Sequence, residues 1–222
     1  MLSGSMQYLL GRFSSLPALP LLKEEVKGVT MEDHLTFVVH PDMEKAFGDY
    51  WQGRGYDLAG VWRTMIYPAR HIALAHKAGQ PMIGLSVPNL EDLQHDAPLS
   101  NFLRLYGTHC VGGDGGELFP GKPQHLAYRV DESADLEQVR KAIGCQGFEF
   151  IGSPFEFTDS AGATLRQCFF GLTEAYGTFA ELVQRVSGPR GEEFAGFEAG
   201  QIDLLYSAYD GQSAALLAKA VY

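Results

Sequence analysis

The chain has 222 residues, of which 45% are hydrophobic and 20% are charged, and it carries a formal net charge of −10 at pH 7. This composition is typical of a globular protein, and the negative charge argues against nucleic-acid or anionic-membrane partners, whose phosphates need clustered Lys and Arg. Three widely spaced cysteines favour neither a disulfide framework nor a CxxC metal site. This cysteine usage suits a reducing cytoplasm, where we expect the protein. No apolar run reaches the ~18 residues of a membrane span, so none is expected.

Residues 1–30 are expected to form an N-terminal arm that precedes a single domain over 31–222. The domain begins with module one, residues 31–90, which contains "HLTFVVHPDMEKAFGDYWQGRGYDLAG" at 34–60. An alternating strand turns at Pro41-Asp42 into an amphipathic helix that ends near Gly55. Module one is therefore predicted to be β-α-β-β-β, with strands near 34–39, 56–66, 70–76 and 81–87.

A linker is predicted over 91–123. It contains "GGDGG" at 112–116, which we interpret as a loop. No strand leads into a GxGxxG or GxxxxGK pattern there, so the glycines do not predict a phosphate-binding loop.

Module two, residues 124–190, repeats module one with an offset of 91 residues, so that "HLAYRVDESADLEQVRKAIGCQGFEFIG" begins at His125. Its strands are predicted near 125–130, 148–157, 164–171 and 178–185. One such module cannot bury both faces of its sheet, so the two are expected to pair side by side. A C-terminal helix over 191–222 could cover the pocket between them.

The last predicted strand of module two, "GTFAELVQR", carries a carboxylate between apolar residues. Phe179, Glu181 and Val183 share one face because side chains alternate along a strand. A buried, unpaired charge is very costly. Glu181 must therefore be exposed at a sheet edge, paired with a cation or bound to a metal.

The repeat supplies possible partners for Glu181. His34 and His125 begin equivalent strands, and the larger apolar residues of each strand lie on the opposite face. The imidazoles should thus point away from the helices, into the space that Glu181 can also reach. Two histidines and one carboxylate form the facial arrangement associated with non-heme Fe(II). The position in module one that matches Glu181 is Gly84, so no fourth ligand is predicted.

Simpler interpretations apply to the other polar residues. A single histidine at a strand start is commonly a surface or hydrogen-bonded residue. The remaining histidines have no repeat partner, although His71 and His76 could lie in a pocket or on the surface. Asp33 is interpreted as solvent-facing or as a strand-end cap.

The motifs "PQHLAYRV", "LRQCFFGLTEAYGTFAELVQR" and "FAGFEAGQIDLLYSAYD" resemble the vicinal oxygen chelate superfamily. The similarity spans about 30–210 and is greatest to the catalytic domain of the 4-hydroxyphenylpyruvate dioxygenase and hydroxymandelate synthase family. It implies an α+β fold in which two paired βαβββ modules form an open, curved, barrel-like sheet around a metal pocket. It also implies Fe(II), or another divalent metal, on His34, His125 and Glu181.

The resemblance assigns further residues to the pocket. Gln124 and Gln167 would be catalytic amides, and the aromatic walls would be Phe169, Phe179 and Phe197. The sequence departs from the family in lacking its extra N-terminal domain. In place of the family's serine and polar amides on module one it has His71, Ser86 and Asn101, and Ile202 replaces an aromatic of the C-terminal segment.

These observations predict an Fe(II)-dependent dioxygenase that acts on an aromatic or related α-keto acid by oxidative decarboxylation and hydroxylation. Its expected partners are O₂ and a small-molecule substrate, and a homodimer is plausible. One alternative is another metalloenzyme of the superfamily, such as an isomerase, a lyase or an extradiol dioxygenase. A second alternative is a small-molecule-binding relative without turnover.

Overall fold

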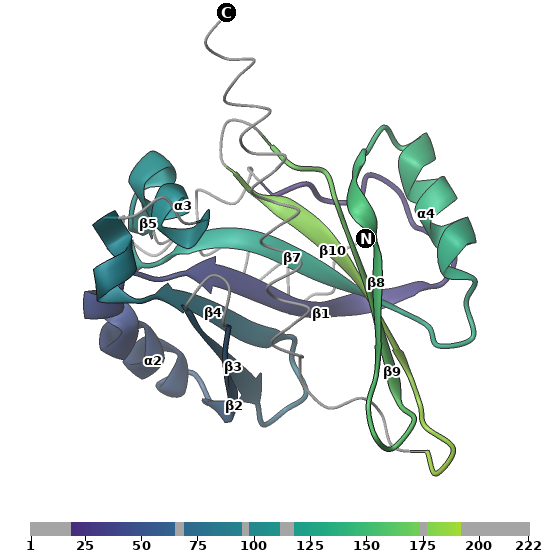
Figure 1. The fold of residues 1–222 in the computed structure, drawn as a ribbon, viewed down its shortest axis with the longest axis horizontal. Coiled ribbons are helices and arrows are strands. Elements are labelled where there is room, and N and C mark those ends of the chain that lie inside the picture. The colour runs from purple at the N-terminus through teal and green to yellow at the C-terminus, as the bar shows by residue number, and fades with distance from the viewer. Residues whose placement is uncertain (1–18, 65–68, 95–97, 112–117, 174–176, 192–222) are drawn as a thin grey trace, which may run out of the picture.

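The computed structural model describes residues 19–64, 69–94, 98–111, 118–173 and 177–191. Two βαβββ modules are present, as predicted (Figure 1). Module one consists of β1 (Val29–Val38), α2 (Glu44–Gln52), β2 (Tyr56–Arg63), β3 (Ala69–His76) and β4 (Met82–Pro88), with a short 3-10 helix, η2 (Pro41–Met43), before α2. Module two consists of β7 (Lys122–Val130), α4 (Leu136–Cys145), β8 (Phe150–Thr158), β9 (Thr164–Phe170) and β10 (Phe179–Val186).

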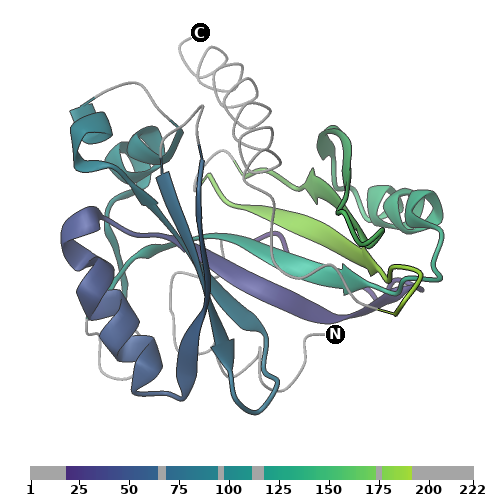
Figure 2. The same ribbon diagram turned by 60° about the horizontal axis from the view of Figure 1, so that its bottom comes forward.

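The two modules join into one open, curved sheet of eight strands in the order β2-β3-β4-β1-β7-β10-β9-β8 (Figure 2). The first strands of the modules, β1 and β7, pair antiparallel at its centre. Each of them also pairs in parallel with the last strand of its own module, β4 or β10. The arrangement has approximate two-fold symmetry, which places equivalent residues of the two modules opposite one another.

The helices cover one face of the sheet. Phe47 and Trp51, four residues apart on α2, and Val139 and Ile143, four apart on α4, are all buried. They contribute to a core with the alternate residues of β1 and β7 that face away from the histidines, including Leu35. Full burial of each such side chain contributes roughly 1.5–3 kcal/mol. The opposite face is left for polar groups near the centre of the sheet.

The chain leaves both helices in the same way. Gly55 follows α2 with φ of 86° and Gly147 follows α4 with φ of 88°. This left-handed backbone conformation is adopted readily by glycine. The two glycines therefore end the helices where the repeat predicted.

The region expected to be a simple linker contains regular structure. It includes a 3-10 helix, η3 (Leu90–Gln94), a helix, α3 (Pro98–Tyr106), and a hairpin of β5 (His109–Val111) and β6 (Leu118–Pro120). Phe102 of α3 is buried against Val38 and Ala69, so α3 covers one end of module one. The "GGDGG" loop prediction falls at 112–116, outside the described residues.

The N-terminal segment is also more integrated than expected. β1 begins at Val29, earlier than the predicted strand, because its first residues pair with the end of β7. Within the expected arm, Leu19 and Val26 are buried in the core. The predicted C-terminal helix lies outside the described residues, apart from Gly191. None of the helices in the described part of the chain has the length and apolar character needed to cross a bilayer.

Candidate metal centre

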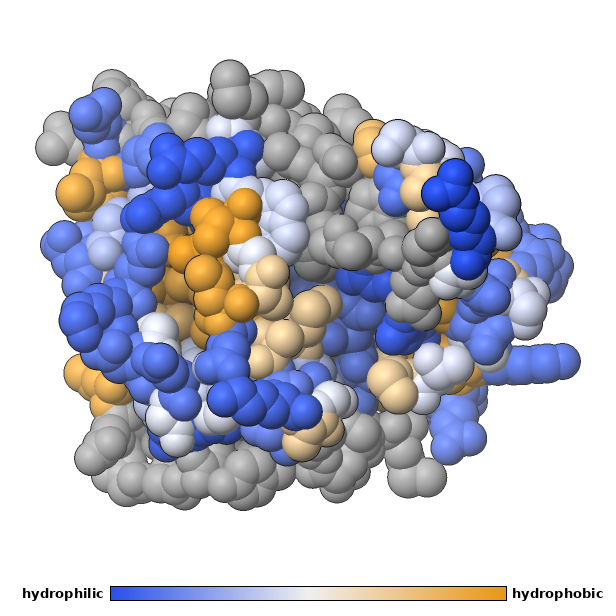
Figure 3. Space-filling view, turned by 90° about the horizontal axis from the view of Figure 1, so that it is seen from below, coloured by the Kyte–Doolittle hydropathy of each residue, from blue (hydrophilic) through white to orange (hydrophobic). Residues whose placement is uncertain are grey.

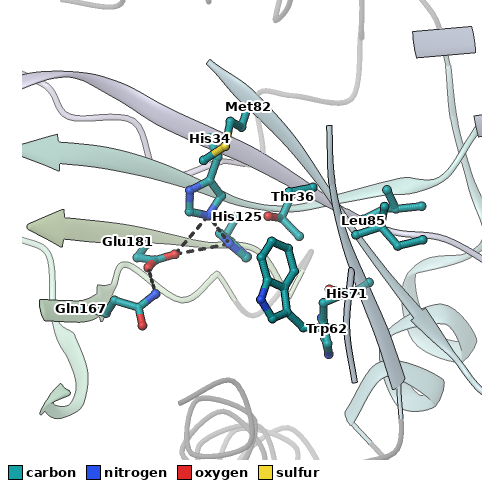
Figure 4. Close-up of a pocket in the computed structure, with 13 residues that line it drawn as sticks. His34, Thr36, Trp62, His71, Met82, Leu85, His125, Gln167 and Glu181 are labelled. Atoms are coloured by element: carbon teal, nitrogen blue, oxygen red, sulfur yellow. Dashed lines mark hydrogen bonds and ion pairs between the residues drawn. The ribbon is translucent and has the colours of Figure 1, made fainter. Parts of the chain in front are cut away.

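Three adjacent strands at the centre of the sheet bring the predicted ligands together. His34 lies on β1, His125 on β7 and Glu181 on β10 (Figure 4). The two imidazole Nε2 atoms are 3.2 Å apart, and each is 3.4 Å from Oε2 of Glu181. The residues are only 4%, 6% and 1% exposed. Glu181 is thus neither at a sheet edge nor exposed, which excludes the first of the three explanations for its charge.

The spacing of these atoms matches what a metal ion requires. Ligand atoms about 2.1 Å from a common ion, at angles of about 90–110°, lie roughly 3.0–3.4 Å from one another. The three donors are of the types that bind Fe(II) and similar divalent ions. Within the described residues they form the one group of at least three His, Cys, Asp or Glu side chains that could hold a metal.

β-Bulges place a polar residue behind each histidine. The β1–β7 register shifts between Glu32 and His34, and again between Thr36 and Phe37. Asp33 is the extra residue in the first bulge, and Gln124 is the extra residue in the second. A bulge redirects side chains, so each extra residue can reach the Nδ1 atom of the histidine that follows it.

Asp33 is buried, which corrects its interpretation as solvent-facing or as a cap. Its Oδ1 lies 3.0 Å from Nδ1 of His34, and its side chain is also bound by Arg185. The guanidinium donates from Nη2 to Oδ1 at 3.2 Å and from Nε to Oδ2 at 3.5 Å. The buried cation therefore compensates the charge of Asp33. Neither Asp33 nor Arg185 was predicted to belong to the site.

The charges around the histidines give them different proton affinities. Burial raises the pKa of Asp33, but the hydrogen bond from His34 and the positive charge of Arg185 hold that pKa well below its usual range. Burial lowers the pKa of His34, but hydrogen bonds to Asp33 and Glu181 outweigh it and raise the pKa to about 9. Burial and the nearby charges of His34 and His71 lower the pKa of His125.

The two predicted catalytic amides support the ligands in different ways. Gln167 donates from Nε2 to Oε1 of Glu181 at 2.6 Å, which leaves Oε2 directed at the histidines, and it lines the pocket. Gln124 is fully buried, with Oε1 3.3 Å from Nδ1 of His125. It is not among the residues that line the pocket, so the structure places it behind a ligand instead of beside a substrate.

The pocket itself extends from the three ligands towards module one. Its polar wall includes His71 and Ser86, joined by a 2.9 Å hydrogen bond between Nδ1 and Oγ. Its other lining residues on module one are largely apolar: Trp62, Ile72, Ala73, Met82, Gly84 and Leu85, together with Thr36. Seen from below, the surface is hollowed near its centre, where hydrophilic residues lie next to an apolar area (Figure 3).

Several residues predicted to contact substrate lie elsewhere. Asn101 is on α3, where Arg104 donates to its side-chain oxygen, and it does not line the pocket. Phe169 and Phe179 are buried and pack edge to face with centroids 5.8 Å apart, and Phe179 also stacks on His125. They thus pack behind the ligands. Phe197 and Ile202 lie outside the described residues.

Three residues that line the pocket were not predicted from the sequence: Trp62, Met82 and Thr36. Thr36 follows from strand parity, because it shares a face with His34. Met82 and Trp62 could have been found from the repeat, since they occupy the positions of Phe179 and Phe155 in module two.

No protein-family model matches the sequence, and no curated protein matches it. Solved structures do. A mutant 4-hydroxymandelate synthase from Streptomyces coelicolor is 18% identical with a TM-score of 0.63, over 87% of this chain and 58% of that protein. A xylose isomerase-like TIM barrel/4-hydroxyphenylpyruvate dioxygenase fusion protein is 12% identical with a TM-score of 0.58, over 84% of this chain and 30% of that one.

A lower TM-score, 0.46, relates the chain to a methylmalonyl-CoA epimerase from Mycobacterium tuberculosis, at 24% identity over 74% of this chain and 91% of the epimerase. The chain has the predicted vicinal oxygen chelate fold, which the similarity to the synthase and the fusion protein establishes. It spans little more than half of the length of the synthase.

Proposed function

We propose that the chain is a metal-dependent oxygenase that acts with O₂ on an aromatic or related α-keto acid, by oxidative decarboxylation and hydroxylation. The observation that carries this proposal is the cluster of His34, His125 and Glu181, whose donor atoms all lie within 4.8 Å of one another. The likeness of the fold to a hydroxymandelate synthase supports the reaction class. The metal would be Fe(II), and it would supply Lewis acid and redox chemistry.

A missing ligand in module one leaves room for the substrate. Gly84 pairs with Thr36 as Glu181 pairs with Ala127, so Gly84 occupies the position equivalent to the carboxylate ligand. A Cβ atom at Gly84 would come within 2.5 Å of Oγ1 of Thr36. Three protein ligands with open coordination positions are typical of catalytic sites, and all three predicted ligands line the pocket.

The pocket residues would divide the work of binding between them. Gln167 holds one oxygen of Glu181 and so fixes the direction of the other. His71 and Ser86 would face the polar end of a substrate, with the imidazole held between Ser86 at Nδ1 and Thr64 at Nε2. Trp62 and Met82 would offer surface to its apolar part. Such a mixture suits a planar, partly apolar molecule with a carboxylate or keto group.

A second candidate is a metal-dependent isomerase or lyase that handles vicinal oxygens. The buried His71 side chain favours it, because an imidazole in contact with the pocket could accept or donate a proton. The two functions differ in their need for O₂.

The proposal is tested by anaerobic Fe(II) titration of the wild type and Glu181→Ala, followed by an oxygen-electrode screen of aromatic α-keto acids. Glu156→Ala provides the control, since it removes an exposed glutamate from β8. We expect Glu181→Ala alone to lose Fe(II) binding, and the wild type to consume O₂ with release of CO₂. Equal Fe(II) binding by the wild type and Glu181→Ala would show the ligand assignment to be wrong. Turnover without O₂ would favour the isomerase or lyase, and binding without turnover would contradict both.

A further inference from the structure

We propose that Asp33 and Arg185 position His34 for metal binding, and that the equivalent support of His125 by Gln124 is weaker because it carries no charge. This inference rests on the proposed metal centre and concerns residues that do not touch the metal. The proposal gives a function to the buried Asp33–Arg185 ion pair, which contributes none of the three ligands.

The contact between Asp33 and His34 uses Nδ1 and leaves Nε2 directed at the other two predicted ligands. Nδ1 faces Oδ1 of Asp33 at 3.0 Å, whereas Nε2 faces Glu181 and His125. Metal-binding histidines commonly donate their second N–H to a carboxylate, which fixes the ring orientation and strengthens the donor nitrogen. Asp33 has the position and the charge to do both.

Arg185 fixes the carboxylate in turn. Two of its nitrogens reach the two oxygens of Asp33, and the pair is shielded from water, with Arg185 7% and Asp33 8% exposed. Arg185 lies on β10, the strand that carries Glu181, while Asp33 lies on β1. The ion pair therefore connects the strand of one ligand to the strand of another across β7.

The pair also balances charge. Asp33 without Arg185 would be an unpaired carboxylate inside the protein, which is costly. Asp33 and Arg185 together carry no net charge, and the negative member of the pair faces His34. Substitution of Arg185 should thus act on His34 through Asp33.

The repeat provides an internal comparison. Gln124 occupies the same bulge position before His125 that Asp33 occupies before His34, and its Oε1 is 3.3 Å from Nδ1. An amide oxygen is a weaker acceptor than a carboxylate. Loss of the contact at Gln124 should therefore affect metal binding less than loss of the contact at Asp33.

The test is a Co(II) titration of the metal-free full chain, followed by the visible d–d absorbance of the bound ion. Asp33→Asn, which keeps the size of the side chain, should weaken Co(II) binding about 10–100-fold and shift the absorbance bands. Asp57→Asn is the matched control, because Asp57 is exposed on β2, and it should leave both unchanged. Gln124→Met should weaken binding less than Asp33→Asn does.

Arg185→Lys keeps the test decisive if Asp33→Asn does not fold. Lysine retains the charge but cannot reach both oxygens in the fixed geometry of a guanidinium, so we expect binding about three- to tenfold weaker. Wild-type affinity and absorbance bands in both variants would overturn the inference. Glu181→Ala, measured beside them, separates the two proposals. If Glu181→Ala alone loses Co(II) binding, the metal centre is right but does not depend on Asp33 and Arg185. If Glu181→Ala binds Co(II) normally, the proposed metal centre itself is wrong.

Discussion

Modules one and two share a backbone plan but carry different side chains at equivalent positions. Both carry on their first strand a histidine that lines the pocket, yet only module two has a carboxylate on its last strand, where module one has Gly84. On the preceding strand, His71 of module one lies where module two has Gln167. Module two supplies two of the three proposed metal ligands and the amide of Gln167 that contacts one of them, and module one forms most of the pocket wall.

The aromatic residues follow the same division. Phe179 stacks on His125 with centroids 4.8 Å apart, whereas the equivalent Met82 lines the pocket beside His34. Duplication thus supplies two similar scaffolds, and substitutions at a few matched positions make one a support and the other a binding surface.

The largest expected effect is a pH dependence that distinguishes the two histidines. Metal binding would displace a proton from His34, whose pKa is raised to about 9, but not from His125, whose pKa is lowered. Below pH 9 each unit of falling pH should weaken the apparent affinity about tenfold, or about 100-fold between pH 8 and pH 6. Calorimetry of Co(II) binding in buffers of different ionisation enthalpy should show about one proton released at pH 7.5. An affinity independent of pH would mean that both histidines are neutral in the metal-free protein.

The second prediction concerns the position that distinguishes Gly84 from Glu181. Gly84→Ala brings a methyl group within 2.5 Å of Oγ1 of Thr36 and should lower the free energy of unfolding by about 1–3 kcal/mol. Thr36→Ala imitates Ala127 of module two and should remove most of that loss when the two changes are combined. Urea denaturation of the single and double variants measures the coupling, and strict additivity would contradict the contact.

The third prediction separates the polar wall from the metal ligands. His71→Ala should raise KM for an α-keto acid substrate about tenfold, the effect of one lost hydrogen bond of roughly 1.4 kcal/mol. Its Fe(II) affinity should stay near that of the wild type. Steady-state kinetics and metal titration test both parts, with His76→Ala on the same strand as control. An unchanged KM would remove His71 from the binding surface.

The smallest expected effect compares the helices. Asp135 caps α4 by accepting hydrogen bonds from the backbone N–H groups of Glu137 and Gln138, whereas Met43 at the start of α2 makes no side-chain cap. Asp135→Ala should therefore cost about 1 kcal/mol of stability. Asp135→Asn keeps a side-chain acceptor at the cap and should cost less than Asp135→Ala. Thermal unfolding of both variants tests the difference, and equal losses would contradict it.

The sequence by itself determined the repeat, the βαβββ order and the sides of the strands to which the ligands point. It could do so because alternation along a strand is local, and because two equivalent histidines must face equivalent directions. These inferences need no knowledge of which strands pair.

The tertiary structure alone decided what surrounds the ligands. Asp33 and Gln124 reach their histidines through bulges, which arise from the pairing of β1 with β7 and which parity along one strand cannot predict. Arg185 meets Asp33 across 152 residues of chain, and Asn101 is carried away from the pocket by α3. Local patterns thus specify which way a side chain points, whereas its partners depend on strand register and packing between distant segments.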